Sequence, residues 1–346
     1  MTEADFLAAL RLLPLHPGAL GLRDDAARLG DLVLTTDTLV EGVHYLSSDP
    51  AGDVAWKLVA TNVSDLAAKG AVPVGVMLNY PLRVSSSPYF ASPAKAGAQL
   101  RNGDGEGQPD VPSAISTGPR PSPGKRERGK ESDWDSAFLQ GFGHALTTFS
   151  APLLGGDTVS LPAQAPRVIT LTAIGTNATA PIRTGARLGD LLYITGTIGD
   201  AGAGLRIAQG QKGPAELLAA YRRPQPRLAE GGALASVVSA MMDVSDGLLI
   251  DAQRMAAASG LSVTLDLADI PLSDLYRVFA GEDRAARIAA ATAGDDYQLL
   301  FAAAPDVALP CAATRVGWFA AGTGLTLIDA GEAVPLPGML GFQHNG

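Results

Sequence analysis

Cysteine is almost absent from this 346-residue chain, in which Cys311 is the only one. A single thiol excludes an internal disulfide and any metal site built from several cysteines. Histidine is also scarce, and no cluster of cysteine and histidine typical of a zinc site is present. This cysteine usage fits a reducing compartment, so we expect a cytoplasmic protein.

Aromatic residues and positive charge are the next shortages. Aromatic side chains make up 5% of the chain, and the formal net charge is −9. Nucleic-acid-binding proteins usually present a basic face and aromatic stacking platforms, so we expect no nucleic acid as a partner. A basic run at 120–130 is compatible with a nucleic-acid-binding tail, but a solvated inserted loop is the favoured interpretation.

Long apolar runs are missing as well. None approaches the roughly 18 residues that a transmembrane helix needs, and we expect no membrane partner. The N-terminus carries acids early and lacks the basic flank of a signal peptide. The sequence also has no GxxxxGK[ST] phosphate-binding loop and no protein-kinase signature set, so any nucleotide must be bound in another way.

What is present is a regular alternation of short apolar strands with amphipathic helices. The expected fold class is therefore α/β, arranged as an α+β two-domain chain. The length predicts two domains, and we place them at 1–180 and 181–346. Residues 83–133 are rich in Ser, Pro, Gly and charge, which predicts a disordered insertion in the first domain.

A polar segment at 35–45, expected to follow a strand at 31–34, is the most informative stretch. It contains Thr35, Thr36, Asp37 and His44 within ten residues. The same pattern, an apolar run followed by small residues and an acid, recurs along the chain. Oxygen ligands of this kind select Mg²⁺, Mn²⁺ or Ca²⁺. The acids of the pattern are Asp24, Asp25, Asp37, Asp65, Asp157, Asp243 and Asp246.

Some of these candidate residues also have a simpler explanation. Asp24 and Asp25 follow a glycine-bounded loop, and as a pair they could cap a turn instead of binding a metal. Asp65 lies in an apolar, alanine-rich segment, where it must be capped by neighbours or bound to a cation. Arg183 is a candidate phosphate ligand, although a lone arginine in a turn is more often a surface charge.

Taken together, seven motifs resemble the thiamine-monophosphate kinase family, of the aminoimidazole-ribonucleotide-synthetase-like superfamily. They occur in order and span nearly the whole chain outside the insertion. The resemblance implies an N-terminal ATP- and Mg²⁺-binding domain whose mixed sheet pairs in a homodimer, followed by a C-terminal α/β domain. The motifs are DD (24–25), TTDTLVEGVHY (35–45), NVSDLAAKGA (62–71), GGDT (155–158), RTGARLGD (183–190), DVSDGL (243–248) and GDDYQLLF (294–301).

The same resemblance implies a magnesium-dependent transfer from ATP to thiamine monophosphate, which gives thiamine diphosphate and ADP. Several Mg²⁺ ions would be held by Asp25, Thr35, Thr36, Asp37, Asp65, Asp157, Asp243 and Asp246. ATP would be contacted by Gly156, Asp157, Arg183 and Ser245, and the acceptor by His44, Asp295 and Phe342.

This reaction suits a site with few histidines. A phosphate monoester has its second pKa near 6, so the attacking oxygen is already anionic at pH 7 and no general base is assigned. The chain departs from the family pattern at Arg23, at Lys69 and at Asp295, where the family usually has a glycine, a methionine and a glutamate. Glu41 has no assigned role.

Two other interpretations compete with this one. The first is another enzyme of the superfamily, such as aminoimidazole ribonucleotide synthetase or selenophosphate synthetase. The latter requires a reactive cysteine or selenocysteine near the N-terminus, whereas Cys311 lies far from it. The second is a catalytically silent protein that binds nucleotide or metal, which the near-complete set of acids disfavours.

Overall fold

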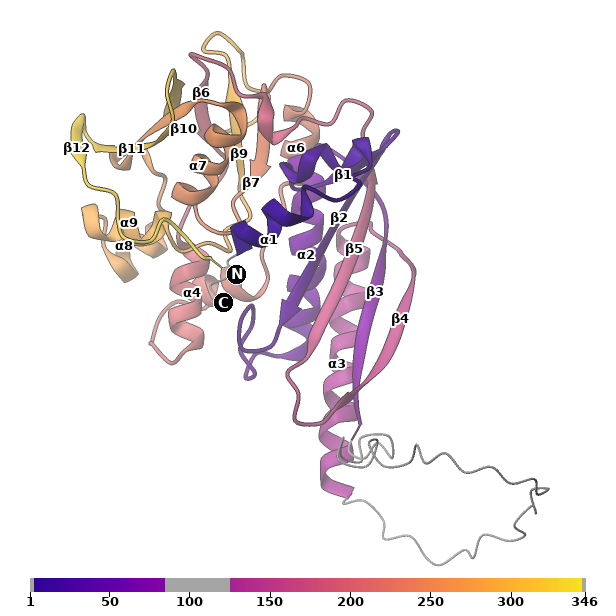
Figure 1. The fold of residues 1–346 in the computed structure, drawn as a ribbon. Coiled ribbons are helices and arrows are strands. Elements are labelled where there is room, and N and C mark those ends of the chain that lie inside the picture. The colour runs from indigo at the N-terminus through magenta and orange to yellow at the C-terminus, as the bar shows by residue number, and fades with distance from the viewer. Residues whose placement is uncertain (1–2, 85–124, 344–346) are drawn as a thin grey trace, which may run out of the picture.

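The computed structural model describes residues 3–84 and 125–343, which form two α/β halves (Figure 1). The N-terminal half contains a mixed five-stranded sheet in the order β1-β2-β5-β3-β4, in which β3 and β4 are parallel and the other neighbours are antiparallel. Its elements are α1 (Glu3–Leu10), a 3₁₀ segment (Pro17–Leu22), β1 (Ala27–Leu29), β2 (Leu32–Val40), α2 (Ala51–Ala68), β3 (Val72–Val84), α3 (Lys125–Thr148), β4 (Leu153–Pro162) and β5 (Val168–Thr176).

The C-terminal half contains a seven-stranded sheet in the order β12-β11-β8-β10-β6-β9-β7. Strands β11 and β8 are parallel, and the other neighbouring pairs are antiparallel. Its helices are α4 (Asp200–Ala208), α5 (Ala215–Arg222), α6 (Leu228–Leu234), α7 (Leu248–Ser259), α8 (Asp274–Ala280) and α9 (Arg284–Ala291). Its strands are β6 (Leu191–Ile194), β7 (Ala240–Asp243), β8 (Ser262–Asp266), β9 (Leu299–Ala303), β10 (Thr314–Ala320), β11 (Gly324–Asp329) and β12 (Glu332–Val334).

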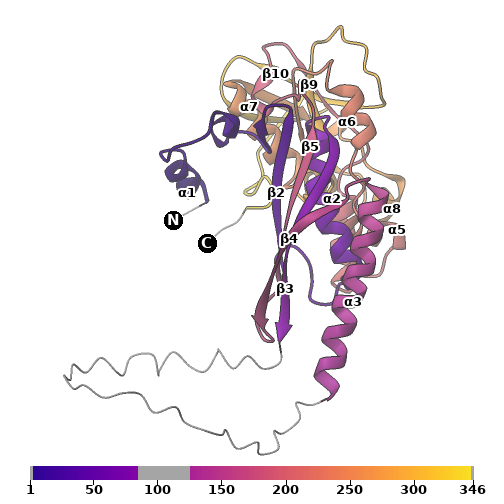
Figure 2. The same ribbon diagram turned by 90° about the vertical axis from the view of Figure 1, so that its right-hand side faces the viewer.

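Helix α2 lies between the two halves and is buried on almost every side. One side packs on the five-stranded sheet, and Figure 2 shows α3 running beside it. The helices touch backbone to backbone, because a Cβ on Gly141 would lie 2.3 Å from the carbonyl oxygen of Gly52. Towards the C-terminal half, a Cβ on Gly231 would lie 2.0 Å from the carbonyl oxygen of Ala67. A helix enclosed in this way needs apolar residues on most of its surface, and α2 has them.

The two sheets and their covering helices confirm the predicted α/β, two-part fold class. The predicted strand at 31–34 was too short, because β2 continues to Val40 and carries Asp37 in its interior. The β-branched residues Thr35, Thr36 and Thr38 favour an extended backbone. All nine residues of β2 pair in unbroken register with β5, from Leu32 opposite Thr176 to Val40 opposite Val168.

The ordered elements reach into both ends of the predicted insertion at 83–133. Strand β3 runs to Val84, and α3 begins at Lys125. Asp135 lies inside α3 and accepts a hydrogen bond from the Tyr80 hydroxyl at 2.6 Å. The rest of the predicted insertion lies outside the described residues. None of the helices within the described ranges is both long and apolar enough to cross a bilayer.

Candidate active site

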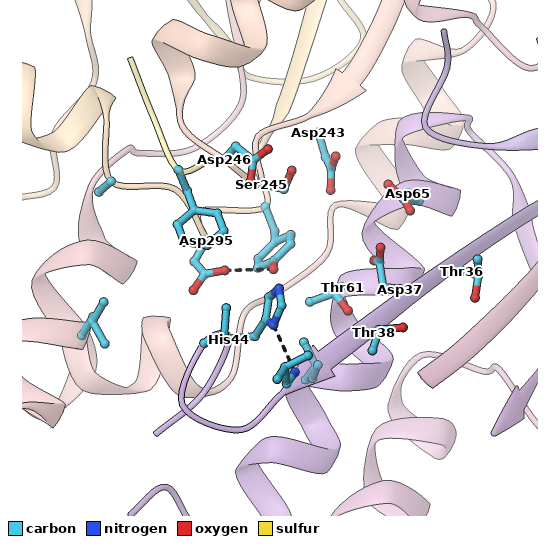
Figure 3. A pocket seen from close by; sticks show the side chains of 17 residues that line it. Thr36, Asp37, Thr38, His44, Thr61, Asp65, Asp243, Ser245, Asp246 and Asp295 are labelled. Atoms are coloured by element: carbon cyan, nitrogen blue, oxygen red, sulfur yellow. Dashed lines mark hydrogen bonds between the residues drawn. The ribbon is translucent and has the colours of Figure 1, made fainter. Parts of the chain in front are cut away.

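A cleft of about 520 Å³ opens where β2 and α2 face the C-terminal half (Figure 3). Both sheets contribute to it, because β2 crosses one wall and the loops after β7 and before β9 form the other. Its lining residues are Thr36, Asp37, Thr38, Leu39, Val40, Val43, His44, Thr61, Asp65, Leu205, Asp243, Ser245, Asp246, Ala293, Asp295, Tyr297 and Phe342.

Carboxylates from three different elements meet at one end of this cleft. Asp37 comes from β2, Asp65 from α2 and Asp243 from the last position of β7. Their orientation is set by hydroxyl groups, because Thr35 donates to the Asp65 carboxylate and Ser64 donates to Oδ2 of Asp243 at 2.6 Å. Figure 3 shows the three acids at the same side of the cleft, away from His44.

The electrostatics of these three acids are those of an uncompensated negative site. Burial, together with the charges of Asp25 and Asp246, raises the pKa of Asp37 to about 6. Burial and the charge of Asp25 raise the pKa of Asp243 to about 8. Burial and Asp37 raise the pKa of Asp65 well above its usual value. Bringing a cation to such a site relieves both the repulsion and the desolvation of the carboxylates.

These carboxylates provide only oxygen donors, which are the ligands that Mg²⁺ prefers. In the described part of the chain, however, no three acidic, imidazole or thiol groups lie close enough together to form a ready-made metal cage. The two observations agree if the ions share their coordination with water and substrate phosphates, as Mg²⁺ commonly does. The residues that could hold the ions are Asp37, Asp65, Asp243 and Asp246.

Asp24 and Asp25 are in a different electrostatic state. Lys69 forms ion pairs with both, and its Nζ lies 3.0 Å from Oδ2 of Asp25. Arg183 reaches the same two acids, with Nη1 3.1 Å from Oδ1 of Asp25 and its backbone N–H donating to Oδ2 of Asp24. Burial alone would raise the pKa of Asp25, but Lys69 and Arg183 outweigh it and hold that pKa below its usual value. This pair is charge-balanced within the chain.

The other end of the cleft carries His44 and Phe342, whose ring centroids lie 6.4 Å apart. Nδ1 of His44 accepts a hydrogen bond from the backbone N–H of Val40 at 3.0 Å. In the neutral ring the proton therefore lies on Nε2. The imidazole can present this N–H to an anionic group.

Asp295 faces His44 and is held by two partners. Its Oδ2 is 2.7 Å from Nζ of Lys57, and its Oδ1 accepts a hydrogen bond from Tyr297 at 3.0 Å. The backbone here is strained, because Asp295 and Tyr297 have positive φ values, of 61° and 48°. Such strain in non-glycine residues persists only where the surroundings enforce it, and it is concentrated at functional sites.

Ser245 and Asp246 line the cleft between its two ends. Asp246 forms an ion pair with Arg254, and its backbone N–H donates to Oδ2 of the buried Asp251 at 3.1 Å. The following Gly247 has φ of 130°, and its N–H donates to the same carboxylate oxygen at 3.2 Å. These bonds fix the turn that carries Asp246 to the start of α7.

The structure brings most of the predicted site residues together, but not Gly156 and Asp157. Both lie on β4, the outer strand of the five-stranded sheet, where Gly156 is in register with Asp37 across β3 and β5. Three strand spacings of about 4.8 Å separate them by roughly 14 Å. Gly156 also has a packing role, since a Cβ there would lie 1.8 Å from the carbonyl oxygen of Leu78. Their assignment to ATP and metal stays a prediction.

Two further residues of the predicted segment have structural contacts. The Thr36 hydroxyl donates to the carbonyl of Leu171 on β5 at 3.1 Å, so its side chain is engaged along the sheet. Glu41, which had no predicted role, forms an ion pair with Arg83 and accepts the backbone N–H of Arg167 at 2.9 Å. It joins β2 to its neighbours.

The sequence reasoning singled out Asp65 and Lys69 but missed Lys57 and Thr61 on the same side of α2. Lys57, Thr61, Asp65 and Lys69 follow one another at intervals of four residues, so they share one side of the helix. Thr61 and Asp65 line the cleft, while Lys57 and Lys69 form ion pairs with acids from two other segments. A polar stripe at this spacing in an otherwise apolar helix is the signal that could have revealed them.

Comparison with known proteins identifies the chain as an AIR synthase related protein. Residues 23–98 and 120–177 match the model of the AIR synthase related protein N-terminal domain, and residues 187–330 match that of the C-terminal domain. The fold is shared with AaThiL complexed with AMPPCP and TMP, at a TM-score of 0.73 and 24% identity over 96% of this chain and all of that one.

Two relatives with higher sequence identity show which family within the AIR synthase related proteins the chain belongs to. A thiamine-monophosphate kinase of Caulobacter vibrioides is 35% identical over 99% of this chain and 91% of its own length. A thiamine-monophosphate kinase structure from Stenotrophomonas maltophilia is 31% identical, with a TM-score of 0.67 over 95% of this chain and 96% of that one. The chain belongs to the thiamine-monophosphate kinase family.

Proposed function

We propose that the protein transfers a phosphoryl group from ATP to thiamine monophosphate, which yields thiamine diphosphate and ADP. The observation that carries this proposal is the division of one cleft into two ends. Asp37, Asp65 and Asp243 form an uncompensated anionic end, and His44 and Phe342 form an end suited to an anionic, aromatic acceptor. A solved relative, AaThiL, is complexed with AMPPCP and TMP.

We propose that Asp37, Asp65, Asp243 and Asp246 hold Mg²⁺, with Thr35 orienting Asp65. When bound, the ions would neutralise the phosphate oxygens of donor and acceptor, which otherwise repel one another. Ser245, between the two ends of the cleft, would contact ATP, and Arg183 would add positive charge near the phosphates. Gly156, Asp157 and Thr36 remain proposed ligands on the resemblance alone. Asp25, which the resemblance also implies as a ligand, is already paired with Lys69 and Arg183.

The chain itself supplies positioning and no general base. An acceptor phosphate is anionic at pH 7 and needs no proton removed before it attacks. His44 would donate its Nε2–H to that phosphate, because its Nδ1 is engaged by Val40. Phe342 and Asp295 would contact the thiamine moiety. Positioning of this kind accounts for much of the rate of a phosphoryl transfer.

The direct test is to incubate the full chain with ATP, Mg²⁺ and thiamine monophosphate and to measure thiamine diphosphate and ADP by chromatography. We expect equal amounts of both products, and no product when EDTA replaces Mg²⁺. ADP release that does not depend on thiamine monophosphate would refute the proposed acceptor. Failure to form any product at millimolar substrate would refute the function.

The lone cysteine offers no support for the selenophosphate-synthetase alternative. Cys311 is half-buried against a cluster that contains Leu299 and Phe301, and it is not among the residues that line the cleft. Burial and the nearby Glu230 raise the pKa of its thiol, which lowers its reactivity.

We also propose that the chain acts in the cytoplasm as a homodimer, with domains at 1–180 and 181–346. The two family models, which end at 177 and begin at 187, support this division. The dimer would form through the face of the five-stranded sheet that α2 does not cover. That face bears exposed apolar side chains, including Met77.

A further inference from the structure

Lys69 is a buried charge that the proposed reaction leaves without a role. It directly follows the last residue of α2, and 3% of its side chain is exposed. Its Nζ contacts Oδ1 of Asp24 and lies 3.0 Å from Oδ2 of Asp25 and 3.2 Å from the carbonyl oxygen of Met241. The ammonium is thus enclosed by oxygen atoms, two of them from carboxylates, which is also the kind of donor set that Mg²⁺ selects.

This cluster adjoins the anionic end of the cleft without lining it. The Thr35 hydroxyl contacts the carbonyl oxygen of Asp25 at 3.4 Å and donates to the Asp65 carboxylate. Met241, whose carbonyl accepts from Lys69, lies two residues before Asp243 on β7. Asp25 and Thr35 therefore connect the Lys69 ammonium to the proposed metal ligand Asp65, and the end of β7 connects it to Asp243.

The charges divide the acids of this region into two groups. Asp24 and Asp25 carry two negative charges and are paired with two positive ones, on Lys69 and Arg183. Within the described residues no ion pair reaches Asp37, Asp65 or Asp243, where charge must come from outside the chain. Asp246 is paired with Arg254, but unlike Asp24 and Asp25 it lines the cleft itself. A second cation at Asp25 would have to overcome the repulsion of an ammonium already in contact with that carboxylate.

We infer that Lys69 is a built-in counter-ion, which takes the place of a metal ion at Asp24 and Asp25 and confines Mg²⁺ to Asp37, Asp65, Asp243 and Asp246. Asp25 then serves to hold Lys69 and Arg183 and is not a metal ligand in this chain. The inference deepens the proposed function and relies on it in expecting Mg²⁺ at the other acids.

Counting bound Mn²⁺ as a substitute for Mg²⁺ tests this, through the electron paramagnetic resonance signal of the free ion. Titrations of the full chain with AMPPCP compare the wild type with Asp25→Asn and Lys69→Met. We expect Asp25→Asn to bind the same number of ions as the wild type. Lys69→Met, which keeps an unbranched side chain but removes the ammonium from both carboxylates, should bind one more ion per chain.

Lys57→Met is the matched control, because Lys57 is also buried on the same side of α2 but pairs with Asp295. Its ion count should equal that of the wild type, so a gain confined to Lys69→Met is not a general effect of losing a buried lysine. The gain also separates a counter-ion from a purely structural lysine, whose removal would change stability but not the number of ions.

Loss of one ion per chain in Asp25→Asn would overturn the inference, as would an unchanged count in a folded Lys69→Met. If Lys69→Met does not fold, the Asp25→Asn count decides alone. If the wild type forms thiamine diphosphate but either variant gives the contradicting ion count, the counter-ion role of Lys69 is refuted and the proposed function stands. A wild type that binds no Mn²⁺ and forms no product refutes both.

Discussion

At the scale of single residues, Asp37 is the acid that distinguishes a metal-dependent site from a polar loop. It lies inside β2, so its backbone is fixed by the ladder with β5, while its carboxylate faces Asp65 and Asp243. Replacing Asp37 with asparagine keeps the shape and removes the charge. We expect turnover to fall by at least about a hundredfold, with a melting temperature in EDTA no lower than that of the wild type.

The measurement is the initial rate of thiamine diphosphate formation together with a thermal melt. Asp31→Asn serves as the control, because Asp31 is exposed in the turn that precedes β2 and is not part of the cleft. Wild-type rates in Asp37→Asn would contradict the metal role. A loss of activity shared by both variants would point to general damage to the strand.

The same acids predict how the metal-free chain responds to pH. The pKa values of Asp37 and Asp243 are raised to about 6 and about 8, above the value of about 4 expected in the unfolded chain. The folded state therefore binds more protons than the unfolded state in this range, and stability falls as the pH rises. In EDTA we expect the melting temperature to decrease from pH 5 to pH 9.

Mg²⁺ reverses this trend if it binds the ionised carboxylates. The gain in melting temperature on adding Mg²⁺ should therefore be larger at pH 8.5 than at pH 5.5, because protonated acids are poor ligands. Differential scanning calorimetry with and without Mg²⁺ at both pH values measures it. A gain that is equal at both would show that these carboxylates are not the binding groups.

At the scale of elements, α2 combines two roles that usually belong to different helices. It is packed on both sides between the two halves, and it also carries the polar stripe that faces the cleft. Lys57, on that stripe, ties α2 to the strained loop of Asp295 and also donates to the carbonyl oxygen of His44 at 3.1 Å. One lysine thereby positions two of the three proposed acceptor-binding residues.

Lys57→Met should loosen both contacts and impair acceptor binding more than ATP binding. We expect the KM for thiamine monophosphate to rise about tenfold, equivalent to about 1.4 kcal/mol, with the KM for ATP within about twofold. Steady-state kinetics with each substrate varied in turn measures this. If both KM values rise together, Lys57 supports the fold of the whole cleft and not the acceptor end.

Much of this architecture could be predicted from local pattern. The apolar run at 168–175 indicates a strand from its residues alone and is β5, and Gly247 marks the start of a helix that ends at Ser259 and is α7. The end of β2 was missed, because its threonines are equally suited to a polar loop and to a strand that a neighbour completes. Strands β10, β11 and β12 were not predicted. Burial does not alternate along β10 and β12, which are defined by pairing with β8 and β11, whereas burial does alternate along β11.

The candidate site likewise has features that the sequence predicts and features that it does not. The acids could be found from motifs, because each follows a recognisable apolar run. Their charge states could not, since these depend on partners far away in sequence, such as Lys69 with Asp25 and Lys57 with Asp295. The position of Gly156 and Asp157 was equally hidden, because the order of strands in a sheet does not follow their order in the chain.

At the scale of the whole molecule, the five-stranded sheet is covered unevenly. Helices α2 and α3 cover one face, whereas Met77 on the central part of β3 is 45% exposed and Val159 on β4 is 54% exposed. Exposed apolar side chains of this kind are unfavourable in water and favour association with a complementary surface. A second copy offers one, since two-fold symmetry places the same face against itself.

We therefore expect the chain to be a dimer, and Met77→Glu to convert it to a monomer, because the two-fold axis would bring two like charges into an apolar interface. Light scattering coupled to size-exclusion chromatography measures the mass directly. Leu139→Glu is the matched control, because Leu139 is 62% exposed on α3, which covers the opposite face. A wild type that elutes as a monomer, or a Leu139→Glu variant that dissociates as readily as Met77→Glu, would refute this interface.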